Sequence, residues 1–215
     1  MKTEDDYRNT LNRVNSQWNK AENAIKLAEQ VNGKVVNPAV FELRYAGRRM
    51  VEAETSRQNG DMEAACARLE DAHFDCCRAQ HDAIDAATAK IGKAYTAATN
   101  RLSPKTVISI FPQYSENFQK LHAVRKKISA SRENRNCRDA VYDAIANVDL
   151  PKLIEDYVDF TTCVPLMKRQ AQFDRGAIVI GALITLAVGI AVGLAVDLFK
   201  QCDNVSPPAV ERVQN

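Results

Sequence analysis

The chain has 215 residues, 29 of them basic and 27 acidic, so its formal net charge is only +2. This balance argues against a protein that holds nucleic acid by general electrostatic attraction, although local contacts with RNA stay possible. Only eight glycines occur. Such a scarcity of turn-forming residues indicates an all-α protein.

Apolar residues recur in steps of four and three over residues 5–31, which predicts a helix with one apolar side. Such a helix can belong to a bundle or to a short coiled coil between two chains. We favour the bundle, because the apolar side includes alanines and aromatic residues where a two-stranded coiled coil prefers aliphatic ones. The apolar positions are Tyr7, Leu11, Val14, Trp18, Ala21, Ile25 and Ala28.

Turn and cap residues predict the next two helices. Asn37-Pro38 provides an N-cap and a proline at the first helical position of a helix that ends near Gln58. Asp61 caps a third helix that reaches about Ala98. The second helix is expected to bury Val40, Leu43, Gly47 and Met50, and the third Met62, Cys66, Leu69, His73, Cys76, Gln80, Ala83 and Ala87.

Shorter helices are expected to complete this domain. One begins at Ser103-Pro104, breaks at Phe111-Pro112 and continues through Ile128. The run RKKISASRENRNCR, residues 125–138, is expected to be a solvated connection, with contact to phosphate or lipid head groups as the alternative. Two further helices are expected at 138–148 and 151–163, followed by a hinge at Val164-Pro165.

The stretch GAIVIGALITLAVGIAVGLAV, residues 176–196, contains no charged residue. At about 1.5 Å per residue it spans roughly 31 Å, close to the hydrocarbon thickness of a bilayer. We predict a transmembrane helix and not a buried core helix, because so small a chain has little protein to surround it. The expected regions are a cytoplasmic helical bundle (1–165), a juxtamembrane linker (166–175), the transmembrane helix (176–199) and a short tail (200–215).

Small residues recur at every fourth position of this span and form a ridge that lets two helix backbones approach closely. The chain has no second hydrophobic span, so the partner helix must come from another copy. The alternative is that glycine and alanine are simply frequent in membrane helices. The expected contact residues are Ala177, Gly181, Thr185, Gly189 and Gly193, and Asp197 continues the series to the mouth of a pore.

Basic residues set the expected orientation of the span. Lys168, Arg169 and Arg175 precede it, and Lys200 and Arg212 follow it. The positive-inside rule then places the first domain of this single-pass protein in the cytoplasm. The opening residues MKTEDDYRNT are acidic and polar, so we expect no signal peptide.

Two groups of polar residues were considered as sites. His73, Cys77 and His81 share a helix face, but the first and last lie about 12 Å apart, so at most two could bind one ion. We therefore expect no metal and no cofactor. The second group has the spacing of ion pairs within and between two helices, either as a buried network or as exposed salt bridges that contribute little: Glu42, Arg44, Arg48, Asp75, Arg78 and Asp82.

The segments ELRYAGRRM (residues 42–50) and RLEDAHFDCCRAQHDAID (residues 68–85) resemble HEPN-type helical domains of bacterial defence proteins. Nucleolytic members of that class cut RNA without metal through an arginine and a histidine four to six residues apart, usually as dimers. The resemblance implies that Arg68 stabilises phosphate charge and His73 moves a proton.

A HEPN-like bundle with one membrane helix is also similar to the small membrane accessory proteins of RNA-targeting CRISPR systems. That resemblance implies a bundle that organises subunits into a membrane pore and a CRISPR or other defence protein as partner. The leading hypothesis is accordingly a non-enzymatic oligomeric effector that permeabilises or depolarises the bacterial inner membrane in antiphage defence. The alternatives are a membrane-tethered ribonuclease and a passive anchor or adaptor for a soluble partner.

Overall fold

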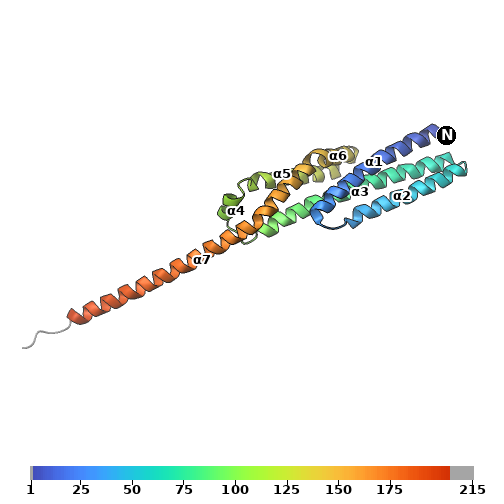
Figure 1. Cartoon of the computed structure of the whole chain (residues 1–215). Coiled ribbons are helices and arrows are strands. Elements are labelled where there is room, and N and C mark those ends of the chain that lie inside the picture. The colour runs from blue at the N-terminus through green and yellow to red at the C-terminus, as the bar shows by residue number, and fades with distance from the viewer. Residues whose placement is uncertain (1, 204–215) are drawn as a thin grey trace, which may run out of the picture. The chain divides into compact units, whose positions relative to one another are not determined.

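The computed structural model describes the backbone of residues 2–203 and the side chains of residues 2–134 and 136–195, and every element in this range is helical (Figure 1). The predicted all-α class is confirmed for these residues. The chain divides into two compact units, the first ending at Pro165 and the second beginning at Leu166. The elements are α1 (Glu4–Asn32), α2 (Asn37–Gln58), α3 (Met62–Thr99), α4 (Pro104–Ile110), α5 (Tyr114–Glu133), the 3-10 turn Arg135–Cys137, α6 (Arg138–Ala144), the π-helical turn Ile145–Asp149 and α7 (Leu150–Asp203).

The ends of the first three helices lie within one residue of their predicted places. The predicted N-cap at Asn37 is wrong, because α2 already begins at Asn37 and its N-cap, Val36, makes no side-chain hydrogen bond. Thr3 and Asp6 form a capping box, in which the Thr3 hydroxyl accepts from the Asp6 amide at 3.2 Å. Gly33 ends α1 in the left-handed conformation, at φ 66°. The Asp61 carboxylate caps α3 by accepting from the Ala64 amide at 2.9 Å.

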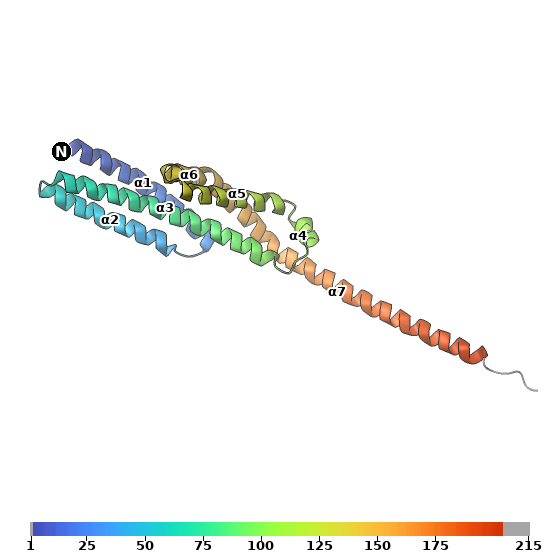
Figure 2. The ribbon, with the colours of Figure 1, turned by 180° about the vertical axis from the view of Figure 1, so that it is seen from behind.

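Helix α3 packs against both α1 and α2, and the three helices run side by side (Figures 1 and 2). The apolar side of α1 faces α3 as predicted: Tyr7, Val14, Ala21, Ile25 and Ala28 are buried, and Leu11 and Trp18 are partly buried. Because this side is covered within one chain, α1 is a bundle helix.

The predicted buried side of α2 is only partly correct. Its fully buried residues are three alanines in steps of seven, Ala39, Ala46 and Ala53. Of the predicted residues, Leu43, Gly47 and Met50 are half-buried and Val40 is 37% exposed. Alanine presents only a methyl group, so it lets α2 approach α3 closely and displaces the larger residues to the edges of the contact.

The predictions for the second half of the unit hold only in part. The break at Phe111-Pro112 is confirmed, because α4 ends at Ile110 and α5 begins at Tyr114. The solvated connection expected at 125–138 is wrong for residues 125–133, since α5 continues to Glu133 with Ser131 still buried, and the connection is limited to 134–137. The helix expected at 151–163 begins at Leu150, one residue before its predicted start, but the hinge expected at Val164-Pro165 is wrong, because α7 runs without interruption through Pro165.

An aromatic cluster fixes the beginning of α7 within the first unit. The ring of Phe160 stacks on Tyr95 of α3 with centroids 4.2 Å apart and meets Phe111 edge-on at 5.6 Å. Tyr114 of α5 lies 6.1 Å from the same ring. Offset and edge-to-face contacts of this kind add to the burial of large apolar area. The cluster therefore joins α3, α5 and the start of α7.

Candidate functional site

The apolar part of α7 in the second unit is the clearest functional feature of the described chain. It contains an 18-residue window with mean hydropathy 2.6 in which no residue is buried. Its large side chains are more than half exposed, from Val188 at 56% to Ile178 at 71%. A core helix would hide these side chains against its own chain, whereas this one leaves them uncovered. The helix is thus long and apolar enough to cross a membrane.

The small residues of this segment leave its surface open. A Cβ atom added at Gly181, Gly189 or Gly193 would meet nothing within 4 Å. The Thr185 hydroxyl donates to the Gly181 carbonyl oxygen at 2.9 Å, so it is satisfied without a partner helix. A shallow hollow of about 630 Å³ lies beside these residues, lined by Ala182, Thr185, Leu186, Gly189 and Ile190.

The ridge of small residues winds around the helix. Each four-residue step turns by about 40°, so Ala177 and Gly193 point about 160° apart on a regular helix. A straight partner helix can cover about three consecutive members of the series. Of the predicted contact residues, Thr185 and Gly189 line the hollow, and Gly193 is the next member of the series. The side chain of Asp197 and residues 204–215 lie outside the described part of the chain.

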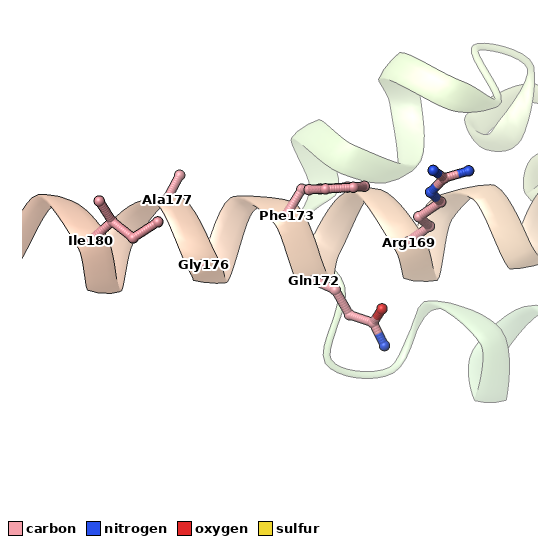
Figure 3. Close-up of a pocket in the computed structure, with 6 residues that line it drawn as sticks. All are labelled: Arg169, Gln172, Phe173, Gly176, Ala177 and Ile180. Carbon is pink, nitrogen blue, oxygen red and sulfur yellow. The ribbon is translucent and has the colours of Figure 1, made fainter.

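A second hollow lies at the N-terminal end of the span, where a linker was expected and α7 is continuous (Figure 3). It has a volume of about 520 Å³. The ring of Phe173 points back along the helix toward Arg169, whose guanidinium carbon lies 5.6 Å from the ring centroid. The lining residues are Arg169, Gln172, Phe173, Gly176, Ala177 and Ile180.

Arg68 and His73 occupy different sides of α3. The Arg68 guanidinium faces Glu52 of α2, at 3.8 Å, and Asp71, at 4.0 Å. His73 is half-buried, and its burial together with nearby Arg13 of α1 lowers the pKa of its imidazole. Five residues turn a helix by about 140°, which accounts for the separation. No contact in the described chain joins the two side chains.

Of the predicted polar network, one pair connects α2 and α3. The Arg78 guanidinium lies 2.9 Å from the Glu42 carboxylate, and burial raises the pKa of Glu42 against the effect of Arg78. Arg48 pairs with Glu52 on its own helix at 3.0 Å.

Two further members of the network, Arg44 and Asp82, make no ion pair among the described residues. The Arg44 guanidinium carbon lies 6.0 Å from the Phe41 ring centroid and 5.9 Å from that of Tyr45. Burial raises the pKa of Asp82.

Sequence reasoning missed the more buried ion pair between these helices. Arg49 donates to Asp75 at 2.7 Å and to Asp71 at 3.0 Å, and the Asp75 side chain is only 6% exposed. A charge so buried is costly unless it is paired. Spacing alone pointed to Asp75, but the arginines that it named on α2 were Arg44 and Arg48.

Gln80, the second polar residue on the expected buried line, joins three helices. It accepts a hydrogen bond from the Gln17 amide of α1 at 2.6 Å and donates to Asp143 of α6 at 2.9 Å. Lys20 of α1 donates to the same Asp143 carboxylate at 2.6 Å. Gln80, a polar residue on the side of α3 that was predicted to be buried, therefore lies where α1, α3 and α6 meet.

His81, the residue after Gln80, packs against α6. Its ring centroid is 3.9 Å from that of Tyr142, and its buried Nε2 forms no hydrogen bond in the described chain, although Asp139 Oδ1 is 3.2 Å away. Burial, reinforced by nearby Arg138, lowers the pKa of His81 to about 4. The imidazole is therefore neutral at pH 7, and its contact with Asp139 is not an ion pair.

Lowering the pH from 7 to 4.5 should destabilise the wild-type chain more than His81→Gln. The unfolded chain binds a proton on His81 near pH 6.5, whereas the folded chain does so only near pH 4. The stability contribution is thus complete above pH 6.5 and is lost as the pH falls, by up to about 3 kcal/mol. Urea unfolding of both proteins followed by circular dichroism measures this difference. Equal pH slopes would contradict a buried neutral imidazole.

A metal at the trio of helix-face residues finds no support in the described geometry. His73 Nδ1 lies 3.9 Å from the Cys77 sulfur. Burial raises the pKa of the Cys77 thiol to about 12, which opposes the thiolate form that zinc requires. No group of three or more His, Cys, Asp or Glu side chains among the described residues is arranged to hold an ion.

Comparison with known proteins finds no match to this chain. The chain matches no protein-family model, no curated protein and no solved structure.

Proposed function

We propose that this protein is a single-pass membrane effector whose first unit lies in the cytoplasm and whose spans associate to permeabilise the bacterial inner membrane. The observation that carries the proposal is the apolar helix of the second unit, no part of whose hydrophobic window is buried. Covering it with lipid removes its apolar side chains from water without exposing any backbone polar group, because a helix satisfies these groups internally.

Association of several copies follows from the small residues in the middle of the span. One helix cannot enclose a path for ions, and the described chain offers one such helix. Gly189 and Gly193 carry no side chain and face open space. They allow a second backbone to approach within van der Waals distance, which is the main attraction between helices in lipid.

The role in antiphage defence rests on the resemblance of residues 42–50 and 68–85 to HEPN-type domains. In this proposal the bundle organises subunits and receives the trigger, with RNA or a CRISPR or other defence protein as its partner. A ribonuclease is the enzymatic alternative. It needs a second copy to complete its site, because Arg68 and His73 of one chain face different helices.

Dye release from liposomes tests the proposal. Purified full-length protein, inserted at increasing density, should release carboxyfluorescein with an initial rate that rises more steeply than protein density. Such a rise is expected when several copies form each pore. Insertion without release at any density would exclude spontaneous permeabilisation and favour the anchor or adaptor, for which the half-exposed Phe41 and Tyr45 of α2 offer a contact surface.

A further inference from the structure

We propose that the hollow at the N-terminal end of the span binds one anionic phospholipid, with Arg169 on its phosphate and the surface from Phe173 to Ile180 along its acyl chain. This inference rests on the proposed insertion of the span. It goes beyond insertion, because it assigns one face of the helix to one class of lipid.

The lining residues share one face of α7. On a regular helix Phe173, Gly176 and Ile180 lie within about 40° of Arg169, and Gln172 and Ala177 border them. Arg169 precedes Gly176, the first residue of the apolar stretch, by about 10 Å along the axis. The headgroup layer on each side of the hydrocarbon is about 5–8 Å thick. Arg169 thus lies at the outer edge of the headgroup layer, where its flexible side chain is within reach of a lipid phosphate.

The charge of the hollow suits a phosphate. Arg169 contacts the face of the Phe173 ring and forms no ion pair with a carboxylate in the described chain. The ring orients the guanidinium and leaves its N–H donors available, and a planar guanidinium can bind two phosphate oxygens at once. The nearest acid, Asp174, lies about 140° around the helix and accepts from Gln170 at 2.9 Å.

The rest of the hollow suits a hydrocarbon chain. Phe173 is 61% exposed and Ile180 is 60% exposed. Between them Gly176 has no side chain and Ala177 has only a methyl group, so a groove remains that an acyl chain can fill. Lipid chains surround a span at this depth, whereas water would leave both side chains uncovered.

The position of the hollow favours lipid over a second copy of the chain. Gly189, at the centre of the proposed helix contact, lies about 160° around the helix from Arg169. When the spans associate through Gly189, the hollow faces outward to the bilayer. The two surfaces are therefore compatible in one assembly.

Lipid retention by the full-length protein tests this assignment. The protein is reconstituted in phosphatidylcholine vesicles containing phosphatidylglycerol and extracted in mild detergent, and its retained lipids are counted by native mass spectrometry. Arg169→Gln should lower retained phosphatidylglycerol about fivefold. Gly176→Leu, which fills the hollow without changing charge, should lower it similarly. Lys168→Gln removes the same charge about 100° around the helix and should change retention less than about twofold.

If Arg169→Gln and Lys168→Gln lost equal amounts of phosphatidylglycerol, unspecific attraction between positive charge and anionic lipid would explain retention, and the proposal would be overturned. Unchanged retention in Arg169→Gln, or displacement of the lipid by millimolar inorganic phosphate, would overturn it too. Alkaline carbonate treatment of the same vesicles distinguishes the absence of the lipid site from the absence of membrane insertion, on which the proposed function depends. Protein that resists extraction but shows no Arg169 effect refutes only the lipid site, whereas protein that carbonate removes refutes insertion.

Discussion

Replacing Ile184 and Val188 by arginine should release the protein from the membrane into the soluble fraction. Both side chains lie near the middle of the apolar stretch and are 59% and 56% exposed, so neither supports the fold of the chain. Each arginine at the centre of a span costs about 3 kcal/mol of insertion free energy, about 6 kcal/mol together. The aliphatic residues of the stretch contribute about 0.3–0.6 kcal/mol each to insertion, and their sum does not offset the cost of the two arginines.

Ile184→Leu with Val188→Leu is the matched control, because it changes shape at the same two positions and keeps the segment apolar. It should remain in the membrane pellet after alkaline carbonate treatment. Far-ultraviolet circular dichroism of the released arginine variant should still report a helical first unit. If the wild-type protein itself is extracted by carbonate, the apolar helix is covered by protein and the membrane assignment is wrong.

The helices that the sequence predicts best are those with a local signal at each end. Thr3, Gly33 and Asp61 act through their own backbone conformation and through hydrogen bonds to residues three or four positions away. Such signals do not depend on the tertiary fold. The span belongs to the same group, because a continuous apolar composition is sufficient to recognise it.

The features that the sequence could not give depend on neighbours far away in the chain. Ala46 and Val40 of α2 are both apolar, and only the approach of α3 decides that the alanine is buried. The basic run after Val124 reads as a loop by composition. It is helical because Ile128 and Ser131 are buried on one side while the charged residues remain in solvent. Pro165 reads as a hinge, but one missing hydrogen bond does not end a helix with well-formed turns on both sides.

The same limit applies to the candidate sites. Arg68 and His73 are close in sequence, yet the helical period sends one toward Glu52 and the other toward α1. The pairing of Arg49 with Asp75 needed the register of α2 against α3. The Arg169–Phe173 contact had a local signal, an aromatic residue four positions after an arginine, and could have been found from the sequence.

Gly189→Leu should weaken association of the spans about tenfold or more, a loss of at least about 1.4 kcal/mol, and should reduce dye release with it. A Cβ at Gly189 meets nothing within 4 Å of its own chain, so the isolated helix accommodates leucine without strain. In the proposed assembly two backbones approach across a glycine surface, and a leucine side chain there should separate them and remove the close packing that holds helices together in lipid.

Ala191→Leu tests whether that loss is specific to one face. It adds a side chain of the same kind two positions away and about 160° around the helix, at an exposed residue. Förster transfer between donor- and acceptor-labelled copies in the same vesicles measures association for both variants. Equal losses would mean that any added bulk disturbs the assembly. Loss in Gly189→Leu alone places the contact on the Thr185–Gly193 side, and loss of dye release in the same variant makes that contact necessary for permeabilisation.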